Sequence, residues 1–341
     1  MRVVLVGATG AVGAEIMGIL EERDLGIDDF VAVASPRSAG RRLRFRGGEV
    51  EVRALAPEVF DGGGIALFDV PDDVSREWAP VAVERGATVV DNSAAWRMDP
   101  DVPLVVPEVN PDAVTKPRRG IIASPNCTML ATIVPVAALD RAARLTRLIC
   151  SSYQAASGAG KAGVDELWDQ LERAVKEPDL VTRGLGREVL EKGSVFAHPL
   201  AMNVIPQIGS VRENGYTGEE VKVGEEIRKV MNRPGLPVTA TCVRVPTVVG
   251  HGVSIHAEFE RPIDAVEARS ILEGAPGVEV QDDTANGVYP TTLGAAGKDP
   301  CFVGRIRQDP YDPNAIEMFA VGDNLRKGAA LNTVQIAELL V

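Results

Sequence analysis

A glycine-rich turn near the start of the chain places the strongest constraint on its fold. Residues 2–6 form a short apolar, β-branched run, residues 7–13 read Gly-Ala-Thr-Gly-Ala-Val-Gly, and residues 14–22 have helical apolar spacing. In such a strand–turn–helix unit, backbone N–H groups and the helix dipole can hold a pyrophosphate. A plain strand-to-helix turn is the alternative. The pattern predicts a dinucleotide site that includes Gly7, Thr9, Gly10, Ala11, Val12 and Gly13.

Further strands alternate with helices through the first third of the chain. Short apolar runs bounded by Gly, Asp or Pro predict strands, and helical spacing predicts helices between them. The predicted strands are 30–34, 65–68, 88–90 and 121–123, and the predicted helices are 78–85 and 129–144. This alternation predicts an α/β fold with a Rossmann-type, doubly wound parallel sheet.

The pattern changes beyond about residue 148, where longer alternating runs begin, such as 239–245 and 253–259. In the second run, Ser254, His256 and Glu258 share one face and apolar side chains share the other, as in a sheet covered on one side. A length of 341 residues also suggests two domains. We therefore expect a first domain of 1–127, completed by a C-terminal helix in 325–341, and an α+β domain of 128–324 with a mainly antiparallel sheet.

Composition limits the partners and the compartment. The formal charge of −12 opposes binding to nucleic acid or to an anionic membrane surface. We expect no targeting segment, and no apolar run approaches the roughly 20 residues of a membrane helix. Its four cysteines are far apart with no CxxC pair, so we expect neither disulfides nor a structural metal, and we expect a cytoplasmic protein.

The end of the second predicted strand indicates which dinucleotide is used. NAD enzymes usually place an acidic residue there for the ribose hydroxyls. This chain instead has Ser35, Arg37 and Ser38, whose hydroxyls and guanidinium suit a 2′-phosphate. NADP is therefore favoured, although a solvated basic loop remains the alternative because three more arginines follow by residue 44.

Cys127 is the candidate nucleophile. It lies in Ser-Pro-Asn-Cys-Thr, between the strand predicted at 121–123 and the helix predicted from 129. A helix N-terminus lowers a thiol pKa and supplies N–H donors for an oxyanion, to which Asn126 could add its side-chain amide. Cys150, Cys242 and Cys301 lack such polar flanks and are interpreted as small buried side chains. The site predicts oxidation or formation of an aldehyde through a thioester.

Three histidines are candidates for the acid/base group. His251 lies in Gly-His-Gly, interpreted as a flexible junction from which an imidazole can point into a cleft. His256 is in mid-strand and is interpreted as structural, while His198 is ambiguous. Arg244 interrupts an apolar strand, which indicates either a paired residue or an anion ligand.

Several blocks, in order along nearly the whole chain, together resemble aspartate-β-semialdehyde dehydrogenases. The blocks are residues 7–13, 35–40, 107–110, 124–128, 153–160, 203–208, 302–307 and 323–330. The resemblance implies reversible conversion of L-aspartate 4-semialdehyde, phosphate and NADP into 4-aspartyl phosphate and NADPH, run reductively for lysine, methionine and threonine synthesis. It also implies a homodimer, sometimes paired into a tetramer, whose first domain binds NADP and whose second domain carries catalysis and dimerisation.

The resemblance also implies roles for individual residues. Cys127 matches the nucleophile, His251 the acid/base, and Gln154 the residue that orients the substrate. Arg244 and Glu219 match the groups that bind the substrate's α-carboxylate and α-amine. Arg97, Asn126 and Lys222 match the phosphate site. Ser157, Gly158 and Asn324 fall in blocks whose members contact the cofactor.

Departures and alternatives accompany this interpretation. Ala94 stands where many relatives carry serine, and Met129 where a small hydroxyl residue is common, which affects details of cofactor and phosphate contacts.

N-acetyl-γ-glutamyl-phosphate reductase shares the thioester chemistry but should lack the 35–40 and 154–160 blocks. Glyceraldehyde-3-phosphate dehydrogenase also shares the thioester chemistry, but this chain lacks the residues that characteristically surround the cysteine of that family. A non-catalytic homologue should have lost Cys127 or His251, and both are present.

Overall fold

The computed structural model describes residues 1–115 and 117–341, which form two compact units. Unit 1 contains residues 1–130, 225–234 and 326–341, and unit 2 contains residues 131–224 and 235–325. The segment 225–234, which the sequence analysis placed in the second domain, therefore packs in unit 1. Within the described ranges, every helix is too short or too polar to cross a bilayer.

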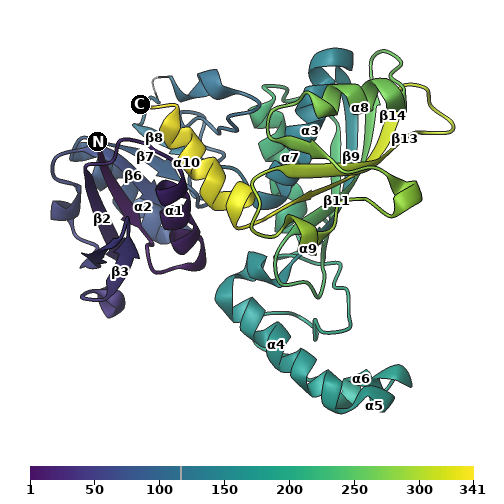
Figure 1. The fold of residues 1–341 in the computed structure, drawn as a ribbon, viewed down its shortest axis with the longest axis horizontal. Coiled ribbons are helices and arrows are strands. Elements are labelled where there is room, and N and C mark those ends of the chain that lie inside the picture. Colours follow the sequence, from purple (N-terminus) through teal and green to yellow (C-terminus); the bar gives the residue numbers. More distant parts are fainter. Residues whose placement is uncertain (116) are drawn as a thin grey trace. The chain divides into compact units, whose positions relative to one another are not determined.

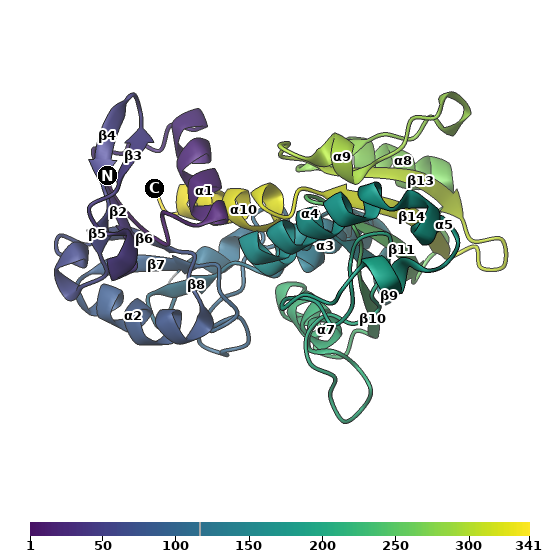
Figure 2. The ribbon, with the colours of Figure 1, turned by 90° about the horizontal axis from the view of Figure 1, so that it is seen from below.

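Unit 1 is built on a six-stranded parallel sheet with the strand order β5-β2-β1-β6-β7-β8. A separate β3–β4 hairpin follows β2 (Figure 2). The elements are β1 (Arg2–Val6), α1 (Ala11–Glu22), β2 (Asp29–Ala34), η1 (Pro36–Ser38), β3 (Arg42–Phe45), β4 (Gly48–Glu51), β5 (Arg53–Ala54), η2 (Pro57–Phe60), β6 (Gly64–Phe68), α2 (Asp72–Glu84), β7 (Ala87–Asp91), η3 (Pro111–Val114), β8 (Ile121–Ala123), η6 (Arg326–Ala330) and α10 (Leu331–Glu338). The predicted α/β class and doubly wound parallel sheet are confirmed.

Helices cover both faces of this sheet. Helices α1 and α10 lie side by side on one face, with α2 on the other (Figures 1 and 2). The apolar side chains of α1 and α10 meet alternate strand residues such as Val3, Leu5 and Leu67 in one buried cluster. Because both faces are covered, most strands are continuous apolar runs, and the sequence located five of the six; β5, which has two residues, was not predicted.

The helix boundaries differ from the prediction where apolar periodicity is weak. Helix α1 begins at Ala11 rather than residue 14, because its first turn is part of the glycine-rich motif: Ala11 is exposed and Gly13 is buried but has no side chain. Helix α2 begins at Asp72 rather than residue 78, and its first turn carries Asp72 and Asp73. Acidic side chains favour a helix N-terminus without contributing to an apolar stripe. The predicted C-terminal helix in 325–341 is instead a π-helical turn followed by α10.

The glycine-rich turn lies where the strand order of the sheet reverses, between β1 and β6. Gly7 adopts a left-handed φ of +101°, and a Cβ there would lie 2.0 Å from the Asp69 carbonyl oxygen after β6. A Cβ on Gly13 would lie 2.3 Å from the Gly7 carbonyl oxygen. Only glycine fits at both positions, so the two strand ends and the helix pack in direct backbone contact.

Unit 2 contains a six-stranded mixed sheet with the order β10-β9-β11-β14-β13-β12. The three central pairings are antiparallel and the two outer ones are parallel, which confirms the mainly antiparallel prediction. The elements are α3 (Cys127–Ala143), β9 (Leu145–Gln154), η4 (Ala156–Ala159), α4 (Gly160–Lys176), α5 (Pro178–Thr182), α6 (Gly186–Val189), α7 (Gly218–Val230), β10 (Val238–Arg244), β11 (His251–Phe259), α8 (Ala265–Glu273), β12 (Val278–Val280), η5 (Thr284–Asn286), α9 (Thr292–Ala295), β13 (Cys301–Gln308) and β14 (Ala315–Gly322). The first residues of α3 and the last of α7 belong to unit 1.

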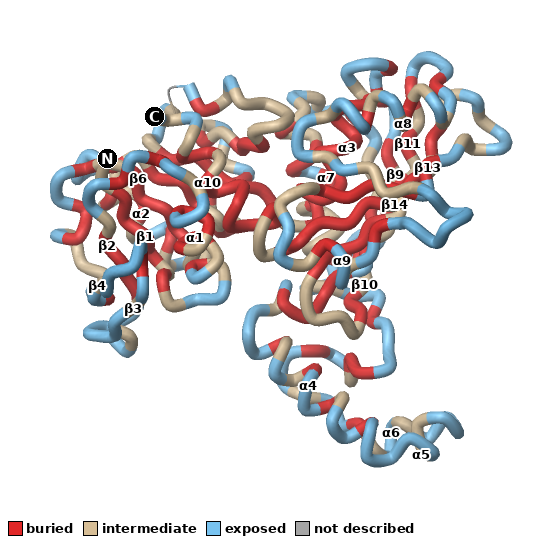
Figure 3. The backbone as a smooth tube through the Cα atoms, in the orientation of Figure 1, coloured by how far each residue is buried: buried red, intermediate tan, exposed pale blue. Residues whose placement is uncertain are grey.

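Burial in unit 2 follows the predicted alternation. In β11, Val253, Ile255 and Ala257 are fully buried, while Ser254 and His256 on the other face are partly exposed. Helices α4 to α6 form an arm with largely exposed ends (Figure 3). A small apolar cluster that includes Leu167 and Phe196 packs α4 against α5, α6 and the residues that follow them.

A buried ion pair joins the C-terminal segment to the rest of unit 1. Lys327 is 1% exposed, and its Nζ lies 2.7 and 2.8 Å from the two carboxylate oxygens of Glu108. The same ammonium contacts the side-chain oxygens of Asn332 and Gln335 at 3.1 and 2.7 Å. Asn332 in turn donates hydrogen bonds to the Val105 carbonyl and to Ser124 Oγ, both at 3.0 Å.

Removing this cation should destabilise the fold strongly. We expect Lys327→Met to lower the free energy of unfolding by about 3–5 kcal/mol, because the buried Glu108 carboxylate would lose the ammonium that neutralises its charge. The control Lys161→Met removes an exposed ion pair with Asp165 and should cost under about 1 kcal/mol. Urea denaturation of both variants measures the difference, and equal losses would contradict the buried-pair account.

Candidate active site

The predicted site residues fall in both units, and each group is described within its own unit. Unit 1 holds the glycine-rich turn, Ser35, Arg37, Ser38, Arg97, Asn126 and Cys127. Unit 2 holds Gln154, Ser157, Gly158, Glu219, Lys222, Arg244, His251 and Asn324.

The predicted dinucleotide turn presents an open helix N-terminus. Gly10 caps α1 without a side-chain hydrogen bond, and Gly10 and Ala11 are exposed. The backbone N–H groups of the first turn are therefore accessible to an anion. At the end of the neighbouring strand β2, Ser35 and Arg37 are exposed and Ser38 is half-buried. The glycine cradle, which a Cβ would fill, and these polar groups fit a phosphorylated dinucleotide.

Cys127 is the first residue of α3 and is partly exposed, whereas the other three cysteines are buried. Burial raises the pKa of Cys150 to about 12 and raises that of Cys242 further, which makes both thiols poor nucleophiles. Asn126 caps the helix, because its Oδ1 accepts hydrogen bonds from the N–H groups of Thr128 and Met129 at 2.8 and 3.2 Å. The Asn126 side-chain oxygen is thus committed to fixing the N-terminus that carries Cys127.

Arg97 lies beside this turn in a dense set of hydrogen bonds. Its Nε donates to the Ser124 carbonyl at 2.9 Å, and its second terminal nitrogen donates to the Asn92 carbonyl at 2.8 Å. Its first terminal nitrogen contacts the carboxylate of Glu226, which is 1% exposed, at 3.2 Å. The sequence analysis did not identify Glu226. The one signal in the sequence was that Glu226 follows Glu219 by seven residues and Lys222 by four, a spacing that places side chains on the same face of a helix.

The two departures from the relatives have ordinary local environments. The Ala94 backbone N–H donates to Asp72 Oδ1 at 2.9 Å, so this residue contacts the first turn of α2 through its backbone. The Met129 side chain is fully buried in unit 1. Neither side chain contributes a polar group to the site.

His251 is completely buried, which corrects the expectation of a flexible junction. The preceding Gly250 has a φ of +91°, its N–H donates to Asn324 Oδ1 at 2.8 Å, and a Cβ there would lie 2.8 Å from the Thr292 carbonyl oxygen. The backbone before the histidine is therefore tightly packed. Desolvation, together with the Arg244 charge, lowers the pKa of His251 to about 3.

The hydrogen bonds of His251 define its tautomer. Nδ1 accepts the backbone N–H of Ala155 at 3.1 Å, so the neutral ring carries its proton on Nε2. Nε2 has no hydrogen-bond partner among the described residues. A Cβ on Gly158 would lie 3.3 Å from this atom and 2.7 Å from a terminal nitrogen of Arg244, so a glycine leaves space beside both groups.

Other polar side chains gather near the ends of β9 and β10 and the start of β11. Gln154 donates to Glu219 Oε1 at 3.3 Å, and buried Arg244 donates to the Ala155 carbonyl at 2.6 Å. Arg244, Gly158 and Phe196 line one pocket of unit 2. Ser157 accepts a hydrogen bond from Asn324 at 2.9 Å, while Lys222 is half-buried on α7. The structure thus brings Gln154 together with Glu219, and Arg244 together with Gly158 and His251.

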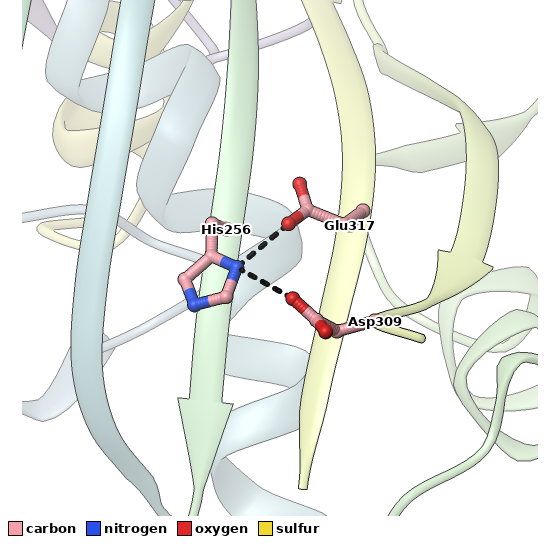
Figure 4. A group of neighbouring side chains, drawn as sticks. All are labelled: His256, Asp309 and Glu317. Carbon is pink, nitrogen blue, oxygen red and sulfur yellow. Dashed lines mark hydrogen bonds and ion pairs between the residues drawn. The ribbon is translucent and has the colours of Figure 1, made fainter. Parts of the chain in front are cut away.

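His256 lies apart, on the partly exposed face of the same sheet (Figure 4). Its Nδ1 is 2.7 Å from Glu317 and 3.7 Å from Asp309, and its Nε2 is 3.3 Å from Glu258. His256, Asp309 and Glu317 offer donor atoms within 4.8 Å of one another, a set that could hold a cation. Desolvation lowers the pKa of His256, but the hydrogen bonds to Glu317 and Glu258 raise it by more, so the net effect is a raised pKa.

Comparisons with known proteins identify the family of this chain. Residues 2–116 match the family described as semialdehyde dehydrogenase, NAD binding domain, and residues 136–327 match semialdehyde dehydrogenase, dimerisation domain. Aspartate-semialdehyde dehydrogenase of Aquifex aeolicus is 46% identical over 100% of this chain and 98% of its own length. The Bacillus subtilis enzyme is 43% identical over 100% of this chain and 97% of its own.

Solved structures give the same result. Aspartate semialdehyde dehydrogenase II of Vibrio cholerae, complexed with ASA, has a TM-score of 0.92 and 41% identity, covering 99% of this chain and 97% of that one. The Candida albicans enzyme with NADP has a TM-score of 0.72 at 22% identity, covering 99% and 98%, which supports the common fold.

The parallel-sheet unit and these matches define an oxidoreductase that uses a nicotinamide dinucleotide and acts on an aldehyde group. The chain belongs to the aspartate-semialdehyde dehydrogenase family, and its role lies in amino-acid biosynthesis. The resemblance stated from the sequence is confirmed.

The burial of His251 leads to a measurable prediction. Because its pKa is lowered to about 3, the ring should stay neutral, with its proton on Nε2, between about pH 5 and 8. NMR of histidine-labelled protein reads both properties, and the His251→Gln spectrum assigns the signal among three histidines. A His251 signal titrating near its ordinary value of about 6.5 would contradict the desolvated site.

Proposed function

We propose that this chain interconverts L-aspartate 4-semialdehyde and 4-aspartyl phosphate with NADP, through a thioester on Cys127, and works in the reductive direction in cells. The main support is the full-length similarity to named aspartate-semialdehyde dehydrogenases. The observation that carries the mechanism is the position of Cys127 at the capped N-terminus of α3. The match to the dimerisation domain supports a homodimer.

In the proposed reaction, Cys127 is acylated by 4-aspartyl phosphate and phosphate leaves. The bound dinucleotide supplies hydride to the thioester in this direction and accepts hydride in the reverse one. The resulting hemithioacetal oxyanion collapses, the C–S bond breaks, and the aldehyde and the thiolate are released. The backbone N–H groups and dipole of α3 favour both the thiolate and the oxyanion beside it.

The tautomer of His251 limits what this residue can do. With Nδ1 accepting the Ala155 N–H, the neutral ring presents Nε2–H. We assign this N–H to the hemithioacetal oxygen, where it stabilises the developing negative charge as a hydrogen-bond donor. Hydride transfer and C–S cleavage through the oxyanion need no net proton, so a ring that stays neutral and donates a hydrogen bond is sufficient at the position predicted for the acid/base group.

The remaining groups suit the anions and the amine of the substrate. Arg97, Asn126 and Lys222 are assigned to phosphate, Arg244 to the α-carboxylate and Glu219 to the α-amine. The hydrogen bond from Gln154 to Glu219 links the substrate-orienting amide to the amine site. We assign Ser157, Gly158 and Asn324, together with the glycine-rich turn, to the dinucleotide.

An assay tests the reaction and the nucleophile together. Protein with aspartate semialdehyde, phosphate and NADP should produce NADPH absorbance continuously, and without phosphate it should give a burst of about one NADPH per site, because the thioester accumulates. Cys127→Ala should abolish both signals and retain NADP binding.

Cys150→Ala is the matched control, because it removes a buried thiol and should keep activity. An active Cys127→Ala variant would exclude the thioester. Turnover only of the N-acetylated glutamate semialdehyde would replace the proposed substrate with the alternative considered above.

NADP preference is proposed from Ser35, Arg37 and Ser38 after β2. We expect Arg37→Ala to raise the KM for NADP by about 10- to 100-fold, because a charged hydrogen bond to the 2′-phosphate is lost, with little change for NAD. Arg44→Ala, an exposed arginine in β3, is the control. An equal effect of Arg37→Ala on both dinucleotides would show that this loop does not select the phosphate.

A further inference from the structure

Glu226 is a buried acidic residue at the junction of two predicted functional groups. One carboxylate oxygen lies 3.2 Å from a terminal nitrogen of Arg97. The other accepts the backbone N–H of Asn126 at 2.6 Å. Carboxylates are rarely buried to this extent unless their charge is paired and hydrogen-bonded. Glu226 therefore joins the Arg97 guanidinium to the residue before Cys127.

The hydrogen bonds of Arg97 leave part of its guanidinium for a ligand. Three of its five N–H groups are directed by protein acceptors, namely the carbonyls of Ser124 and Asn92 and the Glu226 carboxylate. The two others, one on each terminal nitrogen, have no acceptor in the part of the chain that the structure describes. A guanidinium oriented in this way is prepared for an oxyanion, because its rotamer is fixed before binding.

The backbone around Arg97 is fixed from the same helix. Lys229, less than one turn after Glu226 on α7, donates to the carbonyls of Arg97, Asp99 and Val102 at 2.6 to 2.7 Å. Desolvation lowers the pKa of Lys229, as expected for an ammonium withdrawn from water. Segment 225–234 thus holds the Arg97 loop through Lys229 and the Arg97 side chain through Glu226.

We propose that Glu226 is a positioning residue for phosphate: it fixes the Arg97 guanidinium and the Asn126 backbone relative to one another, and so aligns the phosphate group with the Cys127 turn. This inference rests on the proposed function, in which Arg97 binds phosphate. Glu226 itself contacts neither the substrate nor the thiol in this role.

Glu226→Gln tests the proposal because an amide can serve one contact but not both. If the oxygen of the introduced amide accepts the Asn126 N–H, the NH2 group of that amide faces the N–H donors of Arg97. If the amide has the opposite orientation, the Asn126 N–H loses its acceptor. We expect the KM for phosphate to rise about 10- to 100-fold, while the KM for NADP changes little. The NADPH burst without phosphate should keep its amplitude, which separates misplacement of phosphate from general loss of structure.

Two comparisons make the result specific. Arg97→Lys should raise the KM for phosphate similarly, and the double variant should be no worse than the more severe single one, because both changes remove the same interaction. Glu225→Gln changes the adjacent exposed glutamate of α7 and should leave the phosphate KM unchanged.

A second variant covers the case in which Glu226→Gln fails to fold. Glu226→Asp keeps the buried charge but withdraws the carboxylate by about 1.5 Å, so it should also raise the KM for phosphate. An unchanged phosphate KM in either folded variant, or additive effects with Arg97→Lys, would overturn the positioning role. Absence of the burst in the unmodified protein would instead refute the proposed function itself.

Discussion

The buried hydrogen bonds around the turn 124–127 determine how the candidate nucleophile is held. Ser124 receives hydrogen bonds from Asn332 near the C-terminus and from Arg97, while Asn126 donates its backbone N–H to Glu226. These partners come from three segments far apart in the sequence. A short loop would otherwise sample many conformations, and ordering each residue costs about 1–2 kcal/mol of backbone entropy. The same contacts that stabilise unit 1 therefore also give Cys127 one defined position.

Unit 2 contributes a different kind of environment. His251 and Arg244 are both withdrawn from water, and Gly158 keeps the space beside them free of side-chain atoms. Burial holds the imidazole neutral, and the arginine charge reinforces this effect. Electrostatic interactions are stronger where water is excluded, so a single N–H donor there can act strongly on a developing oxyanion. In the proposed reaction, the fixed Nε2–H dipole of His251 stabilises the oxyanion and no proton is transferred from the ring.

The sequence revealed features that depend on local pattern and missed those that depend on distant contacts. The strand–turn–helix unit, the helix after Cys127 and the alternation in β11 follow from short-range spacing and from backbone geometry. Glu226 and Lys327 could not be recognised in this way, because an isolated charged residue on a helix usually lies on a solvated surface. The burial of His251 was missed for a similar reason, since its two glycine neighbours suggested mobility while long-range packing against Thr292 and Asn324 decided the outcome.

Unit 1 is discontinuous in the sequence, and this has a consequence for how the chain is made. At a synthesis rate of about 5–20 residues per second, the ribosome needs roughly 10 to 40 s to proceed from residue 130 to residue 326. Throughout that interval the parallel sheet lacks α10, and Glu108 lacks the ammonium of Lys327. The apolar face that α10 later covers is then open to chaperones or to aggregation. The unit begun first thus becomes complete only after unit 2 has been synthesised.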